Sequence, residues 1–362
     1  MAGLVVQGTN EEEGGAAASI RLPYATHIHA PESQSSVQPA SSISYQGAHP
    51  LARLDVSDDR VQAMGIHGAS LFGYSSWHPG DVNQSSRPAV VLSAGVRNDG
   101  ANAKDVTGRF FFSLSVGLED DMQRAVPHGG GKAVAAANPR ECMLACGQSN
   151  TCASWTMAKG GSCMLADSVP ENAFLEDSYS GVRGGWTASA QDGVCCLVRS
   201  TAYPGPTQGE IGLCFEMPTG ESECEAGAIA TGATLGDLWT DTDGLNGNSA
   251  AVNQLDPIAA LAVPFTAPAG TNTTVDIVMA WSYPNRTWMG RPVGNAYAEL
   301  YPTVHAAASS MLSARGVTLA KIQGTHETFF GSKSLPSTIS DMLVNSLSHT
   351  RSLQWFEDRQ WR

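Results

Sequence analysis

Four cysteines lie close together in the stretch 141–165 ("ECMLACGQSNTCASWTMAKGGSCML"), and clustered thiols can either bind zinc or form disulfides. They are separated by three, five and ten residues: Cys142, Cys146, Cys152 and Cys163. Zinc sites usually combine paired CxxC spacings with nearby histidines, whereas the nearest histidine in this sequence, His128, lies outside the stretch. The spacing therefore favours disulfides, and we expect no metal and no cofactor.

The first two of these cysteines are four residues apart on an expected helix that starts at Pro139, so their side chains leave the same helix face. Four cysteines allow three pairings, and the sequence alone leaves all three open. The nested arrangement, Cys142 with Cys163 and Cys146 with Cys152, is geometrically the simplest. It is the prediction for this cluster.

The other four cysteines form a looser group. Cys195 and Cys196 are adjacent, and neighbouring cysteines rarely bridge each other, whereas Cys214 and Cys224 are expected to close a nine-residue loop. Disulfides form in oxidising compartments. Three Asn-x-Ser/Thr sequons agree with such a compartment, although so short a pattern is common by chance: Asn83, Asn272 and Asn285.

Motifs for familiar enzyme chemistry are absent from the sequence, which has no GxSxG elbow, no P-loop, no HExxH and no GxGxxG after a strand. His27 and His29 have a spacing that could hold a metal, but they fall in an N-terminal segment expected to be flexible. Glycoside hydrolysis needs two carboxylates around a sugar site. Four acids are available, all on expected helical or solvated faces: Glu299, Asp341, Glu357 and Asp358. No catalytic residue is predicted.

The balance of charges argues against two classes of partner. The chain of 362 residues has 21 basic and 34 acidic residues, a formal charge of −13. Phosphate groups would be repelled, so we expect no nucleic acid and no anionic membrane surface as a non-specific partner. No run of eighteen apolar residues predicts a membrane-spanning helix. The N-terminal stretch lacks the basic start and apolar core of a secretion signal, an expectation at odds with the disulfides.

Alternating apolar residues predict β-strands in the middle of the chain. The segments 90–94 and 110–114 both alternate, and the turn residues of "RNDGANAKD" between them give the strongest hairpin pattern in the sequence. A further strand places every second residue from Val275 to Trp281 on one face. Many short strands separated by Gly, Pro and Asn predict an antiparallel β-sandwich.

The segment 301–362 is predicted to be mainly helical. One helix is expected to begin with Pro302 in its first turn and to end at Gly316 as a C-terminal cap. A second helix, within 336–351, has three apolar residues at helical spacing: Ile339, Leu343 and Leu347. The aromatic stretch "SLQWFEDRQWR" follows, and a covering surface usually protects a stretch of this kind.

The stretch that contains the first four cysteines resembles a PAN/Apple module. The resemblance covers about 139–186 and depends on a cysteine-bearing helix, a "CASW" strand, a "CML" strand and the ending "YSGVRGGW". Modules of that family bind proteins or carbohydrates, which implies a protein or glycan ligand contacted by an exposed Trp155 or Trp186. A buried core position is the alternative for Trp155, because it alternates within a strand, and a purely structural insert is equally open.

The sequence around this insert is similar to the N-terminal β domain of glycoside hydrolase family 116, the non-lysosomal glucosylceramidase and β-glucosidase family. The similarity covers roughly 60–125 and 210–362. It depends on motifs in a fixed order, among them "GYSSWHPGDVNQSSRPAVV", "LGDLWTDTDGLNG", "MAWSYPNRTWMG" and "VGNAYAELYPTVHAAA". The stretch "SLPSTISDMLVNSLSHTRSLQWFEDRQWR" resembles the passage of that family from its β domain into a helical (α/α)6 catalytic barrel.

This resemblance implies a catalytic function for the complete enzyme and an accessory function for this chain. In the family the catalytic glutamate and aspartate lie in the barrel, downstream of the position of Arg362, so this chain alone is expected to be inactive. It would be the accessory portion of an enzyme that hydrolyses β-glucosides or glucosylceramide. The implied partners are the helical catalytic domain and a carbohydrate or glycolipid substrate. The alternative is a non-catalytic binding protein that acts through the PAN/Apple-like module.

Five residues near the expected domain junction are implied to shape the rim of the sugar site: Trp281, Asn285, Arg286, Asn295 and Tyr297. Core and interdomain packing is the alternative role for them. The compartment also stays open, because the animal relatives work at cytosolic membrane faces whereas the disulfide-rich insert indicates secretion. A signal sequence preceding this chain would reconcile the two.

We therefore predict a mainly β chain, in which a small disulfide-linked α+β PAN/Apple-like insert interrupts an antiparallel β-sandwich and a helical C-terminal segment follows. The expected parts are a flexible or incomplete N-terminal segment (1–50), the first part of the sandwich (51–138), the insert (139–186), the second part of the sandwich (187–300) and a helical linker toward the catalytic domain (301–362).

Overall fold

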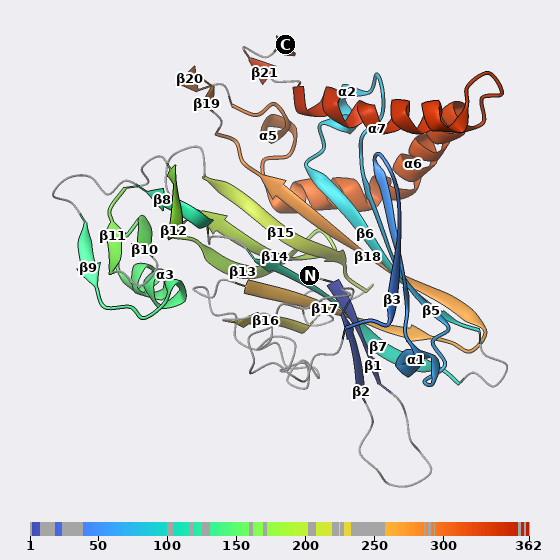
Figure 1. Ribbon diagram of the computed structural model, residues 1–362, viewed down its shortest axis with the longest axis horizontal. Coiled ribbons are helices and arrows are strands. Elements are labelled where there is room, and N and C mark those ends of the chain that lie inside the picture. The colour runs from blue at the N-terminus through green and yellow to red at the C-terminus, as the bar shows by residue number, and fades with distance from the viewer. Residues whose placement is uncertain are drawn as a thin grey trace, which may run out of the picture.

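The computed structural model is a sandwich of two antiparallel β-sheets with helices on one outer face (Figure 1). It describes residues 2–7, 19–23, 39–99, 104–115, 119–124, 131–158, 162–168, 172–201, 208–218, 224, 228–232, 258–285, 287–288, 291–292, 294–353, 356–357 and 360–361. The prediction of a mainly β fold with helices at its C-terminal end is confirmed.

Eight strands form the larger sheet and five form the smaller one. In spatial order the larger sheet consists of β13 (Gly185–Gln191), β14 (Val194–Thr201), β15 (Gly209–Glu216), β18 (Thr271–Ser282), β6 (Ala89–Asn98), β5 (Gly68–Ser75), β4 (Leu51–Ser57) and β3 (Ser42–Ala48). The smaller sheet consists of β16 (Ala228–Gly232), β17 (Ile258–Ala267), β7 (Val106–Ser115), β1 (Ala2–Gln7) and β2 (Ser19–Pro23). All neighbouring strands in both sheets are antiparallel.

A separate five-stranded sheet belongs to the insert, and the remaining described elements are two short hairpins and six helices. The insert sheet has the order β8 (Glu119–Arg124), β12 (Asn172–Val182), β10 (Ser154–Ala158), β11 (Cys163–Ala166) and β9 (Lys132–Val134). The hairpins are β19 (Thr287–Trp288) with β20 (Arg291–Pro292), and β21 (Phe356–Glu357) with β22 (Gln360–Trp361). The helices are α1 (Asp59–Gln62), α2 (Val82–Ser85), α3 (Pro139–Gln148), α5 (Tyr297–Leu300), α6 (Val304–Phe330) and α7 (Ser337–Leu353). None of the described helices combines the length and apolar character needed to cross a membrane.

The apolar faces of the two sheets meet in one core. Successive side chains of a strand point to opposite faces, so every second residue of a strand can enter the space between the sheets. Phe110 and Phe112 of β7 and Ile277 of β18 lie in the same buried cluster. The ring of Phe110 lies 4.7 Å from that of Phe265 on β17, measured between centroids. Aromatic side chains of the smaller sheet therefore fill much of the core.

The strands predicted around 90–94 and 110–114 are present, but they do not form the predicted hairpin. β6 pairs with β5 and β18 in the larger sheet, whereas β7 pairs with β1 and β17 in the smaller one. The hairpin prediction is wrong because alternation identifies a strand and its inward face but not its hydrogen-bonding neighbour. Two strands can satisfy the same apolar pattern by stacking across the core.

The N-terminal segment contributes strands, although its composition predicts a flexible or incomplete segment over 1–50. β1 lies between β7 and β2, and both Leu4 and Val6 are fully buried in the sandwich core. β3 forms an edge of the larger sheet beside β4. The flexible interpretation is therefore wrong for β1, β2 and β3, because a strand of six residues is too short to stand out in a polar, alanine-rich stretch. His27 and His29 lie outside the described residues.

Helix α6 covers part of the outer face of the larger sheet. Six of its side chains are buried in a second apolar cluster: Val304, Ala307, Ala308, Met311, Leu312 and Ile322. The same cluster contains Val91 of β6 and Val278 of β18. Over this area the larger sheet is buried on both faces, which explains why these two strands carry apolar residues on both sides.

The first C-terminal helix runs further than the sequence predicts. Thr303 is the N-cap of α6, where its hydroxyl accepts a hydrogen bond from the backbone three residues on, so Pro302 lies before the helix and not in its first turn. The expected end at Gly316 is wrong, because α6 continues to Phe330. A glycine inside a helix costs only about 1 kcal/mol. Burial of residues beyond it, such as Ile322, outweighs this.

Asp58 links the N-terminal segment to the start of α1. Its carboxylate accepts a hydrogen bond from the Arg60 backbone at 3.0 Å and pairs with the Arg60 guanidinium at 2.7 Å. It also accepts from the backbone and the hydroxyl of Ser41, both at 3.1 Å, and its side chain is only 1% exposed. The hydrogen bonds from Arg60, opposed in part by burial, lower the pKa of Asp58 to about 2.

We expect the protein to lose stability as Asp58 takes up a proton. Because the folded-state pKa lies below the ordinary value of 3.8, the contribution of Asp58 is complete above about pH 4 and is lost as the pH falls toward 2. Asp58→Asn should lower the free energy of unfolding at pH 7 by about 1–2 kcal/mol and remove this part of the pH dependence. Urea unfolding at pH 7 and pH 3 measures both. Asp59→Asn is the exposed control, and identical pH responses of Asp58→Asn and the wild type would contradict the expectation.

Candidate functional site

The segment after β18 forms the loop that contains the predicted rim residues. β18 ends at Ser282, and Pro284 follows, a residue without an N–H to continue the strand pairing. The Ser282 hydroxyl lies 3.3 and 3.0 Å from the backbone oxygens of Tyr301 and Pro302, to which it can donate. The end of β18 is thus tied to the chain directly before α6.

Two predicted rim residues hold the backbone of Tyr283. Asn295 donates from Nδ2 to the Tyr283 carbonyl oxygen at 2.6 Å. The Tyr297 hydroxyl donates to the same oxygen and accepts from the Tyr283 N–H, both at 3.2 Å. Gly294, with a φ of 68°, turns the chain just before Asn295 in a conformation that glycine adopts without strain. These contacts give Asn295 and Tyr297 a positioning role in the loop.

The other predicted rim residues are placed differently. Asn285 is exposed, and its Nδ2 donates to Gln208 Oε1 at 2.8 Å. Trp281 is half-buried, and its backbone N–H donates to the Pro88 carbonyl oxygen at 3.0 Å. Arg286 lies outside the described residues. The structure therefore brings Asn295 and Tyr297 together around one backbone group, with Asn285 further along the same loop.

Near Tyr283 lies a buried cation that no sequence motif indicates. Arg199 of β14 is 4% exposed, and its guanidinium carbon lies 5.8 Å from the centroid of the Trp186 ring. Burial lowers the pKa of Arg199 to about 10, so it stays charged at neutral pH. Burial and the neighbouring Tyr297 raise the pKa of Tyr283, whereas Arg199 acts in the opposite direction. The one signal in the sequence is an arginine at the end of the apolar run "VCCLVRS".

The described part of this loop is rich in polar and aromatic side chains. Over 281–285 and 294–297 its polar and aromatic side chains carry indole, phenol, hydroxyl and amide groups. Such groups stack on sugar rings and bond to sugar hydroxyls, but they do not supply the two carboxylates that glycoside hydrolysis uses. Glu299 and Asp341 are exposed. Among the described residues no group of three or more His, Cys, Asp or Glu is arranged to hold a metal ion.

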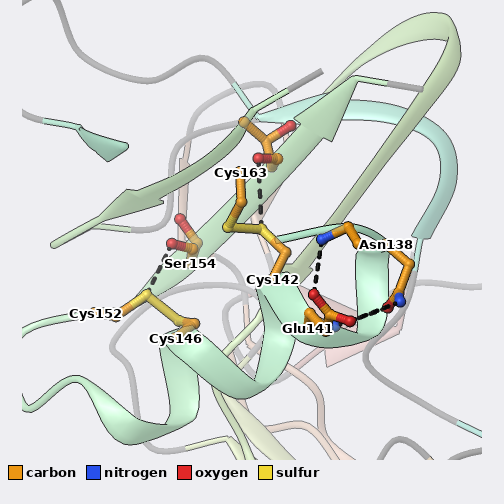
Figure 2. The surroundings of a disulfide bond; sticks show 9 residues. Asn138, Glu141, Cys142, Cys146, Cys152, Ser154 and Cys163 are labelled. Atoms are coloured by element: carbon orange, nitrogen blue, oxygen red, sulfur yellow. Dashed lines mark hydrogen bonds between the residues drawn. A yellow bond between two sulfur atoms is a disulfide. The ribbon is translucent and has the colours of Figure 1, made fainter. Parts of the chain in front are cut away.

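The two disulfides predicted for the insert are confirmed (Figure 2). Cys142 bonds to Cys163 on β11, and Cys146 bonds to Cys152 just before β10, as expected for two cysteines one helical turn apart. They belong to a small buried cluster of the insert that also contains Trp155. The disulfides thus join α3 to the insert sheet.

Helix α3 is fixed at its start by a reciprocal pair of side chains. Asn138 Oδ1 accepts from the Glu141 backbone at 3.0 Å, and Glu141 reaches back to the backbone of Ala137 at 2.7 Å. The two side chains also bond to each other at 3.1 Å (Figure 2). This arrangement sets the start of the helix and hence the positions of its two cysteines.

The predicted bridge between Cys214 and Cys224 is wrong. The structure pairs Cys196 with Cys214 and Cys195 with Cys224. Cys196 and Cys214 lie directly opposite each other on the antiparallel strands β14 and β15, with Cα atoms 4.1 Å apart. Because neighbouring residues of a strand point to opposite faces, Cys195 faces the other side, where Cys224 lies. Strand alignment decides this pairing, and loop length does not.

Both tryptophans predicted as ligand contacts of the insert are buried. Trp155 is 1% exposed within the insert cluster, and Trp186 is fully buried in the sandwich core. The alternative reading of Trp155 as a core residue therefore agrees with the structure. Trp186 belongs to β13 of the larger sheet, and the insert sheet spans 119–182, in contrast to the expected limits of 139–186. As placed, neither ring can contact a ligand.

The fold and the loop define an antiparallel β-sandwich domain with a polar and aromatic loop at the end of β18, a strand of its larger sheet. The chain belongs to the family described as "beta-glucosidase 2, glycosyl-hydrolase family 116 N-term", whose model matches residues 9–317. The resemblance to the N-terminal domain of this family is thereby confirmed, and the chain is an accessory domain of a glycosidase family. The PAN/Apple resemblance of the insert stays a prediction.

Other comparisons are weaker. No curated protein matches the chain. A solved structure named as an aldose 1-epimerase from Escherichia coli K12 is 9% identical, with 67% of this chain and 69% of that chain covered and a TM-score of 0.27. A second, named as a kojibiose phosphorylase from the human microbiome, is 6% identical and has a TM-score of 0.28. The match covers 86% of this chain but only 26% of that one, so the chain spans about a quarter of that protein. A third, a galactose mutarotase-like protein from Lactobacillus casei ATCC 334, is 8% identical, with 67% of this chain and 72% of that chain covered and a TM-score of 0.26. Likenesses this weak support no conclusion about the present chain.

Proposed function

We propose that this chain is the accessory domain of a β-glucosidase, that it packs on a helical catalytic domain carrying both catalytic carboxylates, and that its loop over 281–297 forms part of the rim of the sugar site. The proposed substrates are β-glucosides, glucosylceramide included. Membership of the family supports a glycosidase. The binding groups of the loop, without a pair of carboxylates in its described part, support an accessory role.

The observation that carries the proposal is an apolar surface on the C-terminal helices. Five large apolar side chains on α6, on α7 and between them are at least 37% exposed: Phe330, Leu335, Ile339, Met342 and Leu343. The last three lie at helical spacing and form one stripe along α7, whereas Ser340 and Val344 of the same helix are buried. We name these three residues the α7 stripe. An exposed apolar stripe is typical of a contact with another domain, and a helical domain offers ridges and grooves that fit it.

The position of the α7 stripe suits the proposed arrangement. Hairpin β19–β20, helix α5 and helix α7 all lie along the upper edge of the molecule (Figure 1). The predicted rim residues come from the same part of the chain, from the end of β18 to the start of α5. A catalytic domain that docks on α7 would therefore lie beside this loop.

Purification of the native protein tests the proposal. An antibody against this chain should recover a preparation that hydrolyses a fluorogenic β-glucoside, whereas the isolated chain of residues 1–362 should not. In the native protein, Ile339→Asp combined with Leu343→Asp should weaken the contact with the catalytic domain at least about 100-fold, because apolar contact residues contribute about 2 kcal/mol or more each. The activity per mole of recovered protein should fall, because the loop would no longer be held beside the sugar site. Val317→Asp, at an exposed position of α6, is the control.

Two results would contradict the proposal. One is hydrolysis by the isolated chain at the rate of the native preparation, which would place the chemistry within these residues. The other is an intact native protein without any β-glucosidase activity.

A further inference from the structure

A polar groove lies on the outer face of the larger sheet, beyond the area that α6 covers. Its volume is about 600 Å³, which is within the range of sites that hold small ligands. Residues of β3, β4, β5, β6 and β18 line it, and many of them are small or polar, for example Ser70, Gly95 and Thr274. Two arginines border it, Arg53 and Arg97, and Arg53 pairs with Asp55 at 2.7 Å.

Asn272 forms part of the wall of this groove. It is the second residue of β18, next to the turn at Gly270, and its side chain is exposed. Its carboxamide makes no hydrogen bond to the other residues that the structure describes. Asn272, Thr273 and Thr274 form a sequon, and Thr274 lines the same groove. The acceptor amide and the threonine that its modification requires are thus both beside open space.

In each of the two other sequons, a side chain that modification requires already forms hydrogen bonds within the protein. Asn285 already donates from Nδ2 to Gln208. The serine of the sequon at Asn83 is Ser85, whose hydroxyl donates to the carbonyl oxygen of His78 and accepts from its N–H, at 2.8 and 2.9 Å. Asn83 itself lies within helix α2. Of the three asparagines, Asn272 is the one with a free amide beside a groove.

The disulfides indicate a compartment in which such an asparagine can be modified. All eight cysteines are paired, in four disulfides. Disulfides persist in oxidising environments such as the secretory pathway, where sequons of exposed segments receive N-linked glycans. Bond formation at cysteine and at asparagine would then take place in the same compartment.

We propose that Asn272 carries an N-linked glycan and that the groove accommodates its first sugars. The donor is an oligosaccharide on a lipid diphosphate, supplied with its transferase by the host cell. A bond forms between Asn272 Nδ2 and C1 of the first sugar, the bond between C1 and the diphosphate oxygen breaks, and the amide nitrogen loses one proton as the lipid diphosphate leaves. Hydroxyls of the first sugars lie within reach of Arg53, Asp55 and Arg97. This site is independent of the proposed glycosidase role.

Peptide mapping of the native protein tests the modification. Chymotrypsin cleaves after Phe265 and Trp281, which isolates Asn272 from the other two sequons. Enzymatic removal of an N-linked glycan in ¹⁸O-labelled water converts its asparagine to labelled aspartate. We expect labelled aspartate at position 272 in the native protein. Recovery of this peptide with unmodified asparagine would overturn the proposal.

Matched variants made in a eukaryotic secretory host provide the second test. Asn272→Gln and Thr274→Val should each remove the mass of one glycan, whereas Thr273→Ala leaves the sequon intact and should keep it. An unchanged mass in Asn272→Gln would overturn the site. For the groove, the enzyme should release the glycan at 272 more slowly from folded than from reduced, unfolded protein. Equal rates would overturn the placement of the sugars.

Discussion

Replacing Leu4 by alanine is expected to destabilise the protein by about 3 kcal/mol, one of the largest effects of any single truncation in this chain. Leu4 is fully buried in the sandwich core, on a strand that pairs on both sides with neighbours in the smaller sheet. Removing its isobutyl group takes apolar contacts from the core and leaves a cavity that strands fixed on both sides cannot close. Urea unfolding monitored by tryptophan fluorescence measures the change.

Tyr45→Ala provides the matched control for this prediction. Tyr45 also lies in the N-terminal segment, on β3, but is 68% exposed, so its truncation should change the free energy of unfolding by less than about 0.5 kcal/mol. A Leu4→Ala protein as stable as the wild type would mean that β1 does not lie between β7 and β2 in the smaller sheet. The N-terminal segment would then be the tail that its composition predicts.

Removing the disulfide between Cys142 and Cys163 is expected to unfold the insert while the sandwich stays folded. The two cysteines are 21 residues apart in sequence, and a cross-link over that separation stabilises by about 3 kcal/mol through the unfolded state. The buried cluster of the insert is small, so it has little apolar burial to compensate. In Cys142→Ala combined with Cys163→Ala, limited proteolysis should therefore cut within 139–182 first, while the main unfolding transition is retained.

The other disulfide of the insert supplies an internal comparison. Cys146 and Cys152 are only six residues apart, so the corresponding double alanine variant should lose about 2 kcal/mol, less than the first. Proteolysis of the insert should accordingly be slower than in the first variant. Equal proteolysis of both variants and the wild type would show that the insert does not depend on its cross-links. Simultaneous unfolding of the sandwich would show that the two parts are one cooperative unit.

The sequence predicts where the strands of this fold lie much better than it predicts which strands pair with each other. Period-two alternation located β6, β7 and β18, because a half-buried strand must place every second side chain toward the core. It could not tell pairing within a sheet from stacking across the core, so β6 and β7 were expected as a hairpin. β1 escaped prediction because its place in the sheet depends on pairing with β7, a strand about a hundred residues further along the chain.

The disulfide predictions also succeeded where local geometry decides the pairing and failed where the alignment of two strands decides it. Cys142 and Cys146 lie on one helix, where a spacing of four residues fixes their common direction, so local geometry was sufficient. The bridge at Cys214 depends on which residue of β14 lies opposite it, and that is a property of two strands together. Proximity in sequence favoured Cys224 as its partner instead, and this was misleading.

The candidate rim loop was predictable in its composition but not in its contacts. The motif order pointed to Asn295 and Tyr297 without indicating that both bind the backbone of Tyr283. Arg199 was not predicted, because its partner ring, Trp186, comes from a different strand and a buried arginine has no local pattern. Side chains that meet only in three dimensions leave little trace in a single sequence.

The adjacent cysteines of β14 have a consequence for how a faulty copy of this protein could be recognised. Cys196 bonds within the larger sheet, and Cys195 bonds on its opposite face. If β14 slipped by one residue against β15, every side chain would change face, and Cys195 would meet Cys214 in place of Cys196. The choice between two neighbouring sulfur atoms is therefore a chemical record of strand alignment. A misaligned molecule would carry a different set of covalent bonds from a correct one, and mass spectrometry of unreduced peptides could tell them apart.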